Sequence, residues 1–141
     1  MSVTYDEMIH ALSELESDEF LEGLAKEMGD AVDELVAKGF RTATDPYGET
    51  WAPRQLAKGR RTPPHLPLDK SGDMKRGFHT ETNRTGIRLT NPVAYTGFQN
   101  DGTRYVDARA MYPREGDLGN WERPLHDAAL GFMASKLNEG V

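Results

Sequence analysis

Two groups of charged side chains are the parts of this sequence best suited to bind a ligand or partner. The first lies in residues 54–61 and holds four bases with no acid between them: Arg54, Lys58, Arg60 and Arg61. Cations spaced in this way could neutralise several phosphates, which would give salt-sensitive nucleic-acid binding without sequence preference. Because the chain as a whole carries a net charge of −6, a segment that faces solvent or a protein partner is the favoured interpretation.

The second group is acidic and occupies the N-terminal part of the chain. Residues 1–37 hold 11 acids and one base (net −10), whereas the remaining 104 residues hold 12 acids and 16 bases (net +4). A run of like charges is typical of a solvated helix face. Two unlike surfaces also suit head-to-tail contact between copies of the chain, in which an acidic arm meets a basic neighbour. The acids expected at such a contact are Glu14, Glu16, Asp18 and Glu22.

Residue types that perform catalysis show no suitable spacing. No two of the four histidines are spaced to lie on one helix face as metal ligands. The sequence has no cysteine, no Gly-x-Ser-x-Gly elbow and neither common glycine-rich nucleotide-binding motif. We therefore predict a protein that is not an enzyme and takes no metal or cofactor. Two alternatives stay open: a small metal-dependent hydrolase built from distant His and Asp residues, and stacking of single-stranded bases on Tyr95, Phe98, Tyr105 and Tyr112.

The size and hydropathy of the chain fit one domain spanning residues 1–141, long enough to bury a core. The sequence contains no run of about 18 apolar residues of the kind that crosses a membrane. The first ten residues lack the basic and apolar regions of a secretory signal. These features predict a cytoplasmic protein without a membrane partner.

The N-terminal region predicts two helices, which form an acidic helical arm over residues 1–39. A capping-box pattern begins a short helix at Thr4, which ends between positions 13 and 16. Ser17 can cap a second helix, whose apolar residues follow the helical period. Lys38 in the last turn and Gly39 just beyond it predict the C-terminal end of this helix.

An irregular but anchored loop region is predicted over residues 40–74. Asp45-Pro46-Tyr47-Gly48 has the chemistry of a tight turn, because an aspartate accepts backbone hydrogen bonds, a proline fixes φ and a glycine tolerates a positive φ. Nearby aromatic side chains add enough apolar area to hold this turn on a core. Prolines between positions 53 and 67 prevent a regular element there. The residues expected to anchor the loop are Phe40, Asp45, Pro46, Tyr47, Gly48 and Trp51.

A small antiparallel sheet is predicted over residues 75–113, followed by a helix over 120–138. We expect strands at 75–80 and 87–90 joined by a turn at 83–86, and a last strand within 104–112. Residues 93–98 fit either a helical turn or a third strand. Pro124 suits the first turn of the final helix. The predicted fold class is therefore α+β, with N-terminal helices, a long irregular loop, a small antiparallel β-sheet and a C-terminal helix.

Four segments in this order resemble the virion-morphogenesis or tail-completion proteins of tailed phages, a group close to their neck and tail-terminator proteins. The most specific segment is Asp45-Pro46-Tyr47-Gly48-Glu49-Thr50-Trp51-Ala52-Pro53. The others are Leu68 to Met74, similar to the family's Leu-Asp-x-(Ser/Thr)-Gly-x-Leu; Pro92 to Gly102, similar to its Tyr-Ala followed by His-Gln-x-Gly; and Ala108 to Pro113, similar to its Pro-Ala-Arg-x-Phe. Phe98 stands where the family often has His, and Asp107 where it often has Pro.

The resemblance implies a structural virion protein without catalysis. Such proteins assemble as a ring, often six-fold, at the head-proximal end of the tail, where the ring completes the tail or joins it to the head. The implied partners are further copies of the chain, the tail tube and the head–tail connector proteins, and genomic DNA passes through the ring. The implied location is the tail or neck of the virion, after assembly in the host cytoplasm. A small protein that binds nucleic acid through residues 54–61 is the alternative.

Overall fold

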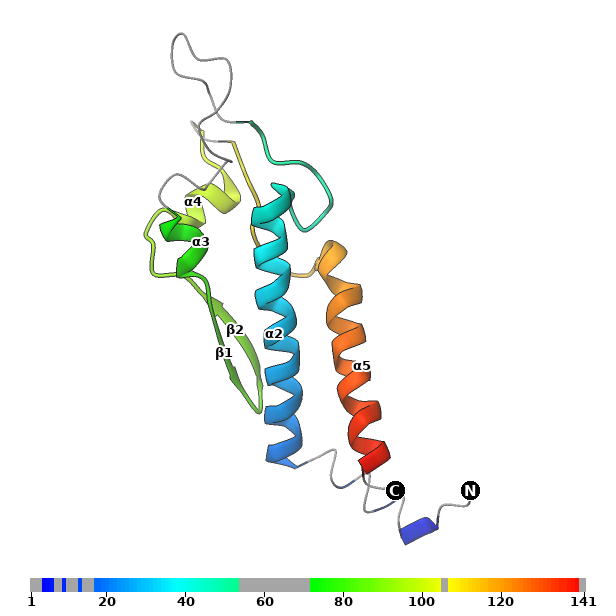
Figure 1. Cartoon of the computed structure of the whole chain (residues 1–141). Coiled ribbons are helices and arrows are strands. Elements are labelled where there is room, and N and C mark those ends of the chain that lie inside the picture. The colour runs from blue at the N-terminus through cyan, green and yellow to red at the C-terminus, as the bar shows by residue number, and fades with distance from the viewer. Residues whose placement is uncertain are drawn as a thin grey trace.

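The computed structural model describes residues 4–6, 9, 13, 17–53, 72–104 and 107–139. The predicted helix over 4–16 falls mostly outside these residues; the four described positions with helical backbone are Tyr5, Asp6, Ile9 and Ser13. In the described part a long helix stands between a β-hairpin on one side and the C-terminal helix on the other (Figure 1). This combination of helices with a small two-stranded antiparallel sheet confirms the α+β fold class.

The long helix α2 covers Asp18–Thr42 and begins as predicted. Ser17 is its N-cap, and the Ser17 hydroxyl accepts the backbone N–H of Phe20 at 3.1 Å. The predicted end at Gly39 is wrong, because the helix continues to Thr42 and stops where Ala43 adopts a left-handed φ of 51°. Continuing the helix places Phe40 on its buried face, so burial of this ring outweighs the stop signal that Gly39 provides.

A β-hairpin packs against α2. Its strands are β1 (His79–Asn83) and β2 (Gly86–Thr90), which pair antiparallel around the predicted turn. The strand expected at 75–80 begins later than predicted, because Asp73–Gly77 forms the short helix α3 instead. Gly72 precedes α3 with a left-handed φ of 75°, and the helical turn carries Met74 into the core. Burial of Met74 is a tertiary requirement that the local pattern does not express.

The short helix α4 (Thr96–Asp101) lies between the hairpin and the last helix. Of the two alternatives predicted for residues 93–98, the helical turn is therefore correct. The strand expected within 104–112 is wrong for its described residues, 104 and 107–112, which have no strand. Side chains take the place of a strand partner there. Asn100 Oδ1 accepts the N–H of Met111 at 2.7 Å and that of Tyr112 at 3.2 Å.

A 3₁₀ turn, η1 (Gly119–Trp121), leads into the C-terminal helix α5 (Glu122–Glu139). Pro124 occupies the first turn of α5, as predicted. Helix α5 lies along α2, and the rings of Phe20 and Phe132 meet with centroids 5.4 Å apart (Figure 1). None of the helices in the described ranges is both long and apolar enough to span a bilayer.

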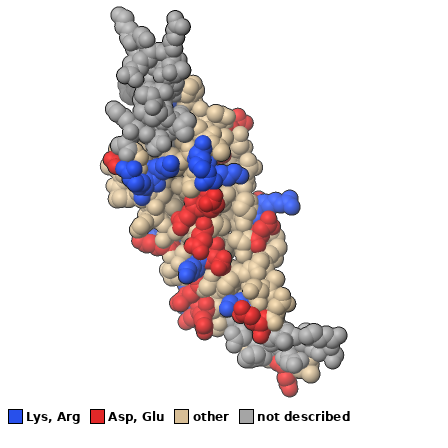
Figure 2. Space-filling model, viewed as in Figure 1, with Lys and Arg blue, Asp and Glu red and all other residues tan. Residues whose placement is uncertain are grey.

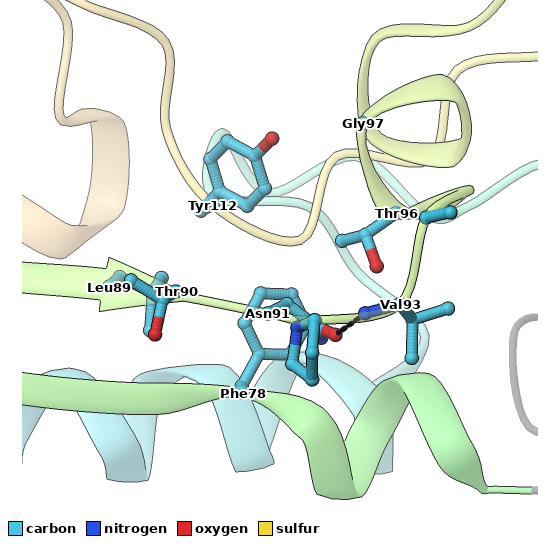
Figure 3. Close-up of a pocket in the computed structure, with 10 residues that line it drawn as sticks. Phe78, Leu89, Thr90, Asn91, Val93, Thr96, Gly97 and Tyr112 are labelled. Carbon is cyan, nitrogen blue, oxygen red and sulfur yellow. Dashed lines mark hydrogen bonds between the residues drawn. The ribbon is translucent and has the colours of Figure 1, made fainter.

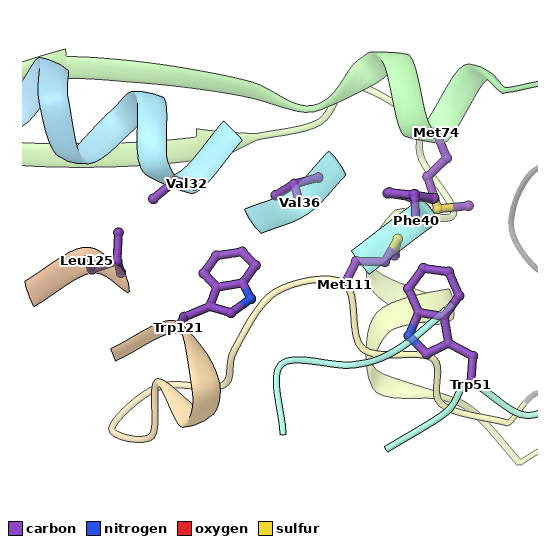
Figure 4. Close-up of a cluster of buried hydrophobic side chains, with 8 residues drawn as sticks. All are labelled: Val32, Val36, Phe40, Trp51, Met74, Met111, Trp121 and Leu125. Atoms are coloured by element: carbon purple, nitrogen blue, oxygen red, sulfur yellow. The ribbon is translucent and has the colours of Figure 1, made fainter. Parts of the chain in front are cut away.

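One cluster of buried apolar side chains joins these elements (Figure 4). It draws residues from α2, the loop after it, α3, the segment before η1, η1 itself and α5: Val32, Val36, Phe40, Trp51, Met74, Met111, Trp121 and Leu125. Phe40 and Trp51 pack edge to face with centroids 5.4 Å apart, a favourable aromatic geometry. Residues distant in sequence therefore depend on one another for burial.

Candidate assembly interface

The turn at Asp45 to Gly48 is held from within by the aspartate. Asp45 Oδ1 accepts the backbone N–H groups of Tyr47 and Glu49, each at 2.9 Å. The Gly48 N–H donates to the Asp45 carbonyl at 3.1 Å, and Gly48 has a φ of 91°. These bonds are the turn chemistry expected from the residue types, so the conformation of the turn is specified locally.

The same turn docks on the loop that precedes α5. The Asn120 N–H donates to the Pro46 carbonyl at 2.6 Å, and the Tyr47 hydroxyl donates to the Asp117 carbonyl at 3.0 Å. The guanidinium of Arg114 lies over the Tyr47 ring, 4.7 Å from its centroid. Pro46 is buried by this contact, although prolines are mostly exposed in proteins. The turn thus serves as a structural joint between the two long helices.

Residues after the turn are joined to the segment at 108–113. Trp51 is 4% exposed, and its indole N–H donates to the Ala110 carbonyl at 2.9 Å. Arg109 Nε donates to the Ala52 carbonyl at 2.8 Å, and a terminal nitrogen of Arg109 donates to the Pro53 carbonyl at 3.1 Å. The Arg109 N–H in turn donates to the Gln99 carbonyl at 2.8 Å. The six residues predicted to anchor the loop therefore all lie at packed or hydrogen-bonded positions.

The charged residues predicted for a subunit interface are only partly described. Glu14, Glu16, Arg54, Lys58, Arg60 and Arg61 lie outside the described residues, so their predicted pairing stays a prediction. Asp18 and Glu22 are exposed in the first turns of α2. Asp18 contacts Arg84 of the hairpin turn at 3.3 Å, an exposed pair that adds little stability.

Charges are unevenly placed on the described surface. Figure 2 shows acidic side chains gathered along one face, below a group of basic ones. The exposed acids of α2 are Asp18, Glu19, Glu22, Glu27, Asp30, Asp33 and Glu34. Exposed bases lie in the last turns of α2 and in α3: Lys38, Arg41, Lys75 and Arg76. This second basic group has no local sequence signal, because its members come from two separate segments.

A pocket of about 340 Å³ lies where the end of β2, the Asn91–Ala94 turn, the start of α4 and Tyr112 meet (Figure 3). Its walls combine apolar side chains, among them Phe78, Leu89 and Val93, with polar ones such as Asn91 and Thr96. Thr96 Oγ1 is buried there without a hydrogen-bond partner among the described residues. Burial, and next the nearby Asp101 carboxylate, raise the pKa of the Tyr112 phenol. Among the described residues that line this pocket, none form an acid–base pair.

Within the described ranges, no group of three or more His, Asp or Glu side chains is placed to hold a metal ion. The geometry of the site is instead that of backbone joints and exposed charged faces, which suits contact with other macromolecules. No protein-family model, curated protein or solved structure matches this chain.

Proposed function

We propose that this protein is a structural virion protein that forms a ring at the head-proximal end of a phage tail, where it completes the tail or joins it to the head. The observation that carries the proposal is the convergence of the tail-completion-like segments. Trp51, Met74 and Met111 belong to three of the four segments and lie in one buried cluster (Figure 4).

Hydrogen bonds link the same segments. The Trp51 indole bonds to Ala110, and the backbone of Arg109 bonds to Gln99 in the remaining segment. The amide of Asn91, directly before that segment, donates to the Met74 carbonyl at 2.8 Å. The residues behind the resemblance thus act as one set of packing and hydrogen-bonding partners. Such a set supports a shared architecture, and none of its bonds has the geometry of an acid–base or nucleophilic site.

A ring requires heterologous contacts, in which one patch of a subunit binds a different patch of the next subunit. The exposed acids along α2 and the basic sequence of residues 54–61 are opposite in charge, as two such patches would be. In our proposal the acidic helical arm packs near the 54–61 segment of a neighbouring copy or of an adjoining ring. The proposed partners are further copies, the tail tube and the head–tail connector, with genomic DNA passing through.

The mass of the purified protein by light scattering, across concentration and salt, tests this proposal. Together with negative-stain images, rings of about six copies would support it, and a monomer under every condition would contradict self-assembly. Arg60→Glu with Arg61→Glu tests the charge pairing, with Arg123→Glu on α5 as the matched control. Unchanged assembly of the double variant at low salt would make that pairing wrong without removing the ring.

Nucleic-acid binding is the second candidate, favoured by two aromatic side chains in the described part. Tyr95 is 46% exposed and Phe98 is 62% exposed, so both rings are available for stacking on bases. DNA affinity measured against salt concentration separates the two functions. Affinity that falls steeply with salt and weakens in the Arg60→Glu, Arg61→Glu variant would favour binding through residues 54–61.

A further inference from the structure

The β-hairpin is a two-stranded sheet whose two edges are open among the described residues. In the described part of the chain β1 pairs with β2 and with no other strand. A two-stranded sheet is marginal by itself, and α2 covers only one of its faces. Open strand edges present unpaired backbone groups, which readily recruit a further strand. The hairpin is therefore the element of the described structure that is best prepared to extend across a subunit boundary.

The register identifies which backbone groups point outward. Asn83 and Gly86 pair across a two-residue turn, so they form a hydrogen-bonded pair, and pairs of this type alternate along the ladder. The N–H and C=O groups of Ile87 and Leu89 consequently point away from β1. Those of Thr80 and Thr82 point away from β2 by the same rule. No hydrogen bond joins these backbone groups to described residues beyond the hairpin.

We propose that the outer edge of β2 in one copy pairs antiparallel with the outer edge of β1 in the next copy, which forms a sheet continuous between subunits. This inference rests on the proposed ring function and names a backbone contact between neighbouring subunits, additional to the proposed charge pairing. A hairpin holds one strand in each direction, so repeating it side by side keeps every neighbouring pair antiparallel. Closing such a sheet into a ring removes all open edges.

The charges on the hairpin favour pairing of β2 with β1 of the next copy over pairing of two β1 or two β2 strands. Glu81 on β1 and Arg88 on β2 stand directly opposite each other and are exposed. Neither side chain makes a hydrogen bond or ion pair with another described residue. If β2 meets β1 of the next copy in the register of the hairpin, Arg88 again faces a Glu81, and opposite charges alternate along the sheet.

Pairing of like strands would produce the opposite result. Two β2 strands in register would bring Arg88 against Arg88, and two β1 strands would bring Glu81 against Glu81. Like charges directly opposite one another are destabilising. Like-strand contacts are also two-fold symmetric, so they would close at a dimer and build no ring. The charge pattern and the symmetry of a ring therefore favour the same contact.

The inner face of the sheet agrees with this arrangement. Thr80 and Thr82 face α2, where the Thr80 hydroxyl donates to Asp33 at 3.0 Å and a Cβ on Gly29 would meet Thr82 Cγ2. Ile87 and Leu89 pack on the core from the same face. This face thus remains against α2 and the core in every copy when hairpins repeat, and the charged residues remain on the other face.

Single cysteines provide the test, since the natural chain has none. Glu81→Cys and Arg88→Cys proteins, each with one cysteine, are mixed, unfolded, refolded together and oxidised. Cross-strand neighbours have Cβ atoms close enough for a disulfide, so the mixture should form a covalent dimer that carries one cysteine of each type. Each protein alone should remain largely uncrosslinked. Glu115→Cys, in an exposed loop, mixed with Arg88→Cys is the matched control.

The outcomes separate this inference from the ring proposal. Crosslinking of Arg88→Cys with itself would show like-strand pairing and overturn the inference. Rings of normal mass without any crosslink would also overturn it, while the ring function would stand. A monomer under every condition would overturn both. As a second measurement, the double variant Glu81→Arg, Arg88→Glu should form its own rings, because its two charges are exchanged and remain opposite. When this variant is mixed with the wild type at low salt, contacts between the two kinds of subunit should be about threefold less frequent than contacts within each kind.

Discussion

The hydroxyl of Tyr47 accepts the backbone N–H of Arg114 at 2.9 Å, 67 positions further along the chain. The same hydroxyl donates to the Asp117 carbonyl, so one side chain ties the turn after α2 to the loop before α5. The C-terminal end of α2 and the start of α5 are therefore held together by the contacts of one side chain. Substitutions at such tertiary contacts should change the free energy of unfolding by amounts that can be measured.

Replacing Tyr47 by Phe should lower the free energy of unfolding by about 1 kcal/mol. The substitution keeps the ring under Arg114 but removes both hydrogen bonds, which are solvent-exposed and contribute about 0.5 kcal/mol each, at the low end of the usual range. Urea denaturation followed by circular dichroism would measure the change. Tyr95→Phe is the control, because the Tyr95 hydroxyl has no hydrogen-bond partner among the described residues and should change stability little. Equal effects of the two variants would show that the joint does not depend on the hydroxyl.

Gly119→Ala should destabilise the protein far more than Gly131→Ala. A Cβ at Gly119 would come within 2.5 Å of Tyr47 Cδ1 and 2.6 Å of the Pro46 carbonyl, at a left-handed φ of 55°. Gly131 lies in α5, where an added Cβ would have no described residue outside its own helix turn within 4 Å, so alanine there should stabilise the helix by about 0.5–1 kcal/mol. Melting temperatures of the two variants give the comparison. A Gly119→Ala protein as stable as the wild type would contradict the close approach of the turn to η1.

Asn100→Leu should destabilise the protein whereas Thr96→Val should not, although both remove a buried polar group from α4. Asn100 Oδ1 accepts two backbone N–H groups, which leucine would leave without their partner, at a cost of about 2–4 kcal/mol. Thr96 Oγ1 has no partner in the described structure, so valine should be neutral or stabilising by up to about 1 kcal/mol. The free energies of unfolding of the two variants, measured by chemical denaturation, would test this prediction. A strongly destabilised Thr96→Val protein would mean that this hydroxyl bonds to a group outside the described residues.

Tyr112 should make stability fall at alkaline pH. Burial, with a smaller effect of Asp101, raises the pKa of the phenol in the folded protein. The folded state therefore keeps the proton to a higher pH than the unfolded chain does. Stability from this difference is complete below the unfolded pKa of about 10 and is lost as the pH rises toward the folded pKa.

Urea midpoints measured from pH 8 to pH 11 would test this dependence on pH. Tyr112→Phe should flatten the decline above about pH 10 relative to the wild type. The difference between these two slopes isolates Tyr112 from the other groups that titrate in this range. Identical slopes would show that burial does not raise the pKa of the Tyr112 phenol.

Features that depend on neighbouring residues were predictable from the sequence alone. The Ser17 cap, the Asp45–Gly48 turn and the Asn83–Gly86 turn formed as expected, because their stabilising bonds lie within a few residues. The α+β class followed from the order of these local signals. The open edges and charge pairing of the hairpin also follow from sequence once its turn is known, since the turn sets the register.

Tertiary structure decided the features in which a distant partner outweighs the local pattern. Helix α2 passes Gly39 because Phe40 is buried against Trp51, and α3 replaces a strand because Met74 belongs to the same core. Residues 107–112 form no strand, since the side chains of Asn100 and Trp51 take up backbone groups there. Burial and side-chain hydrogen bonds between positions far apart in sequence carry no periodic signal, so only the folded chain reveals them.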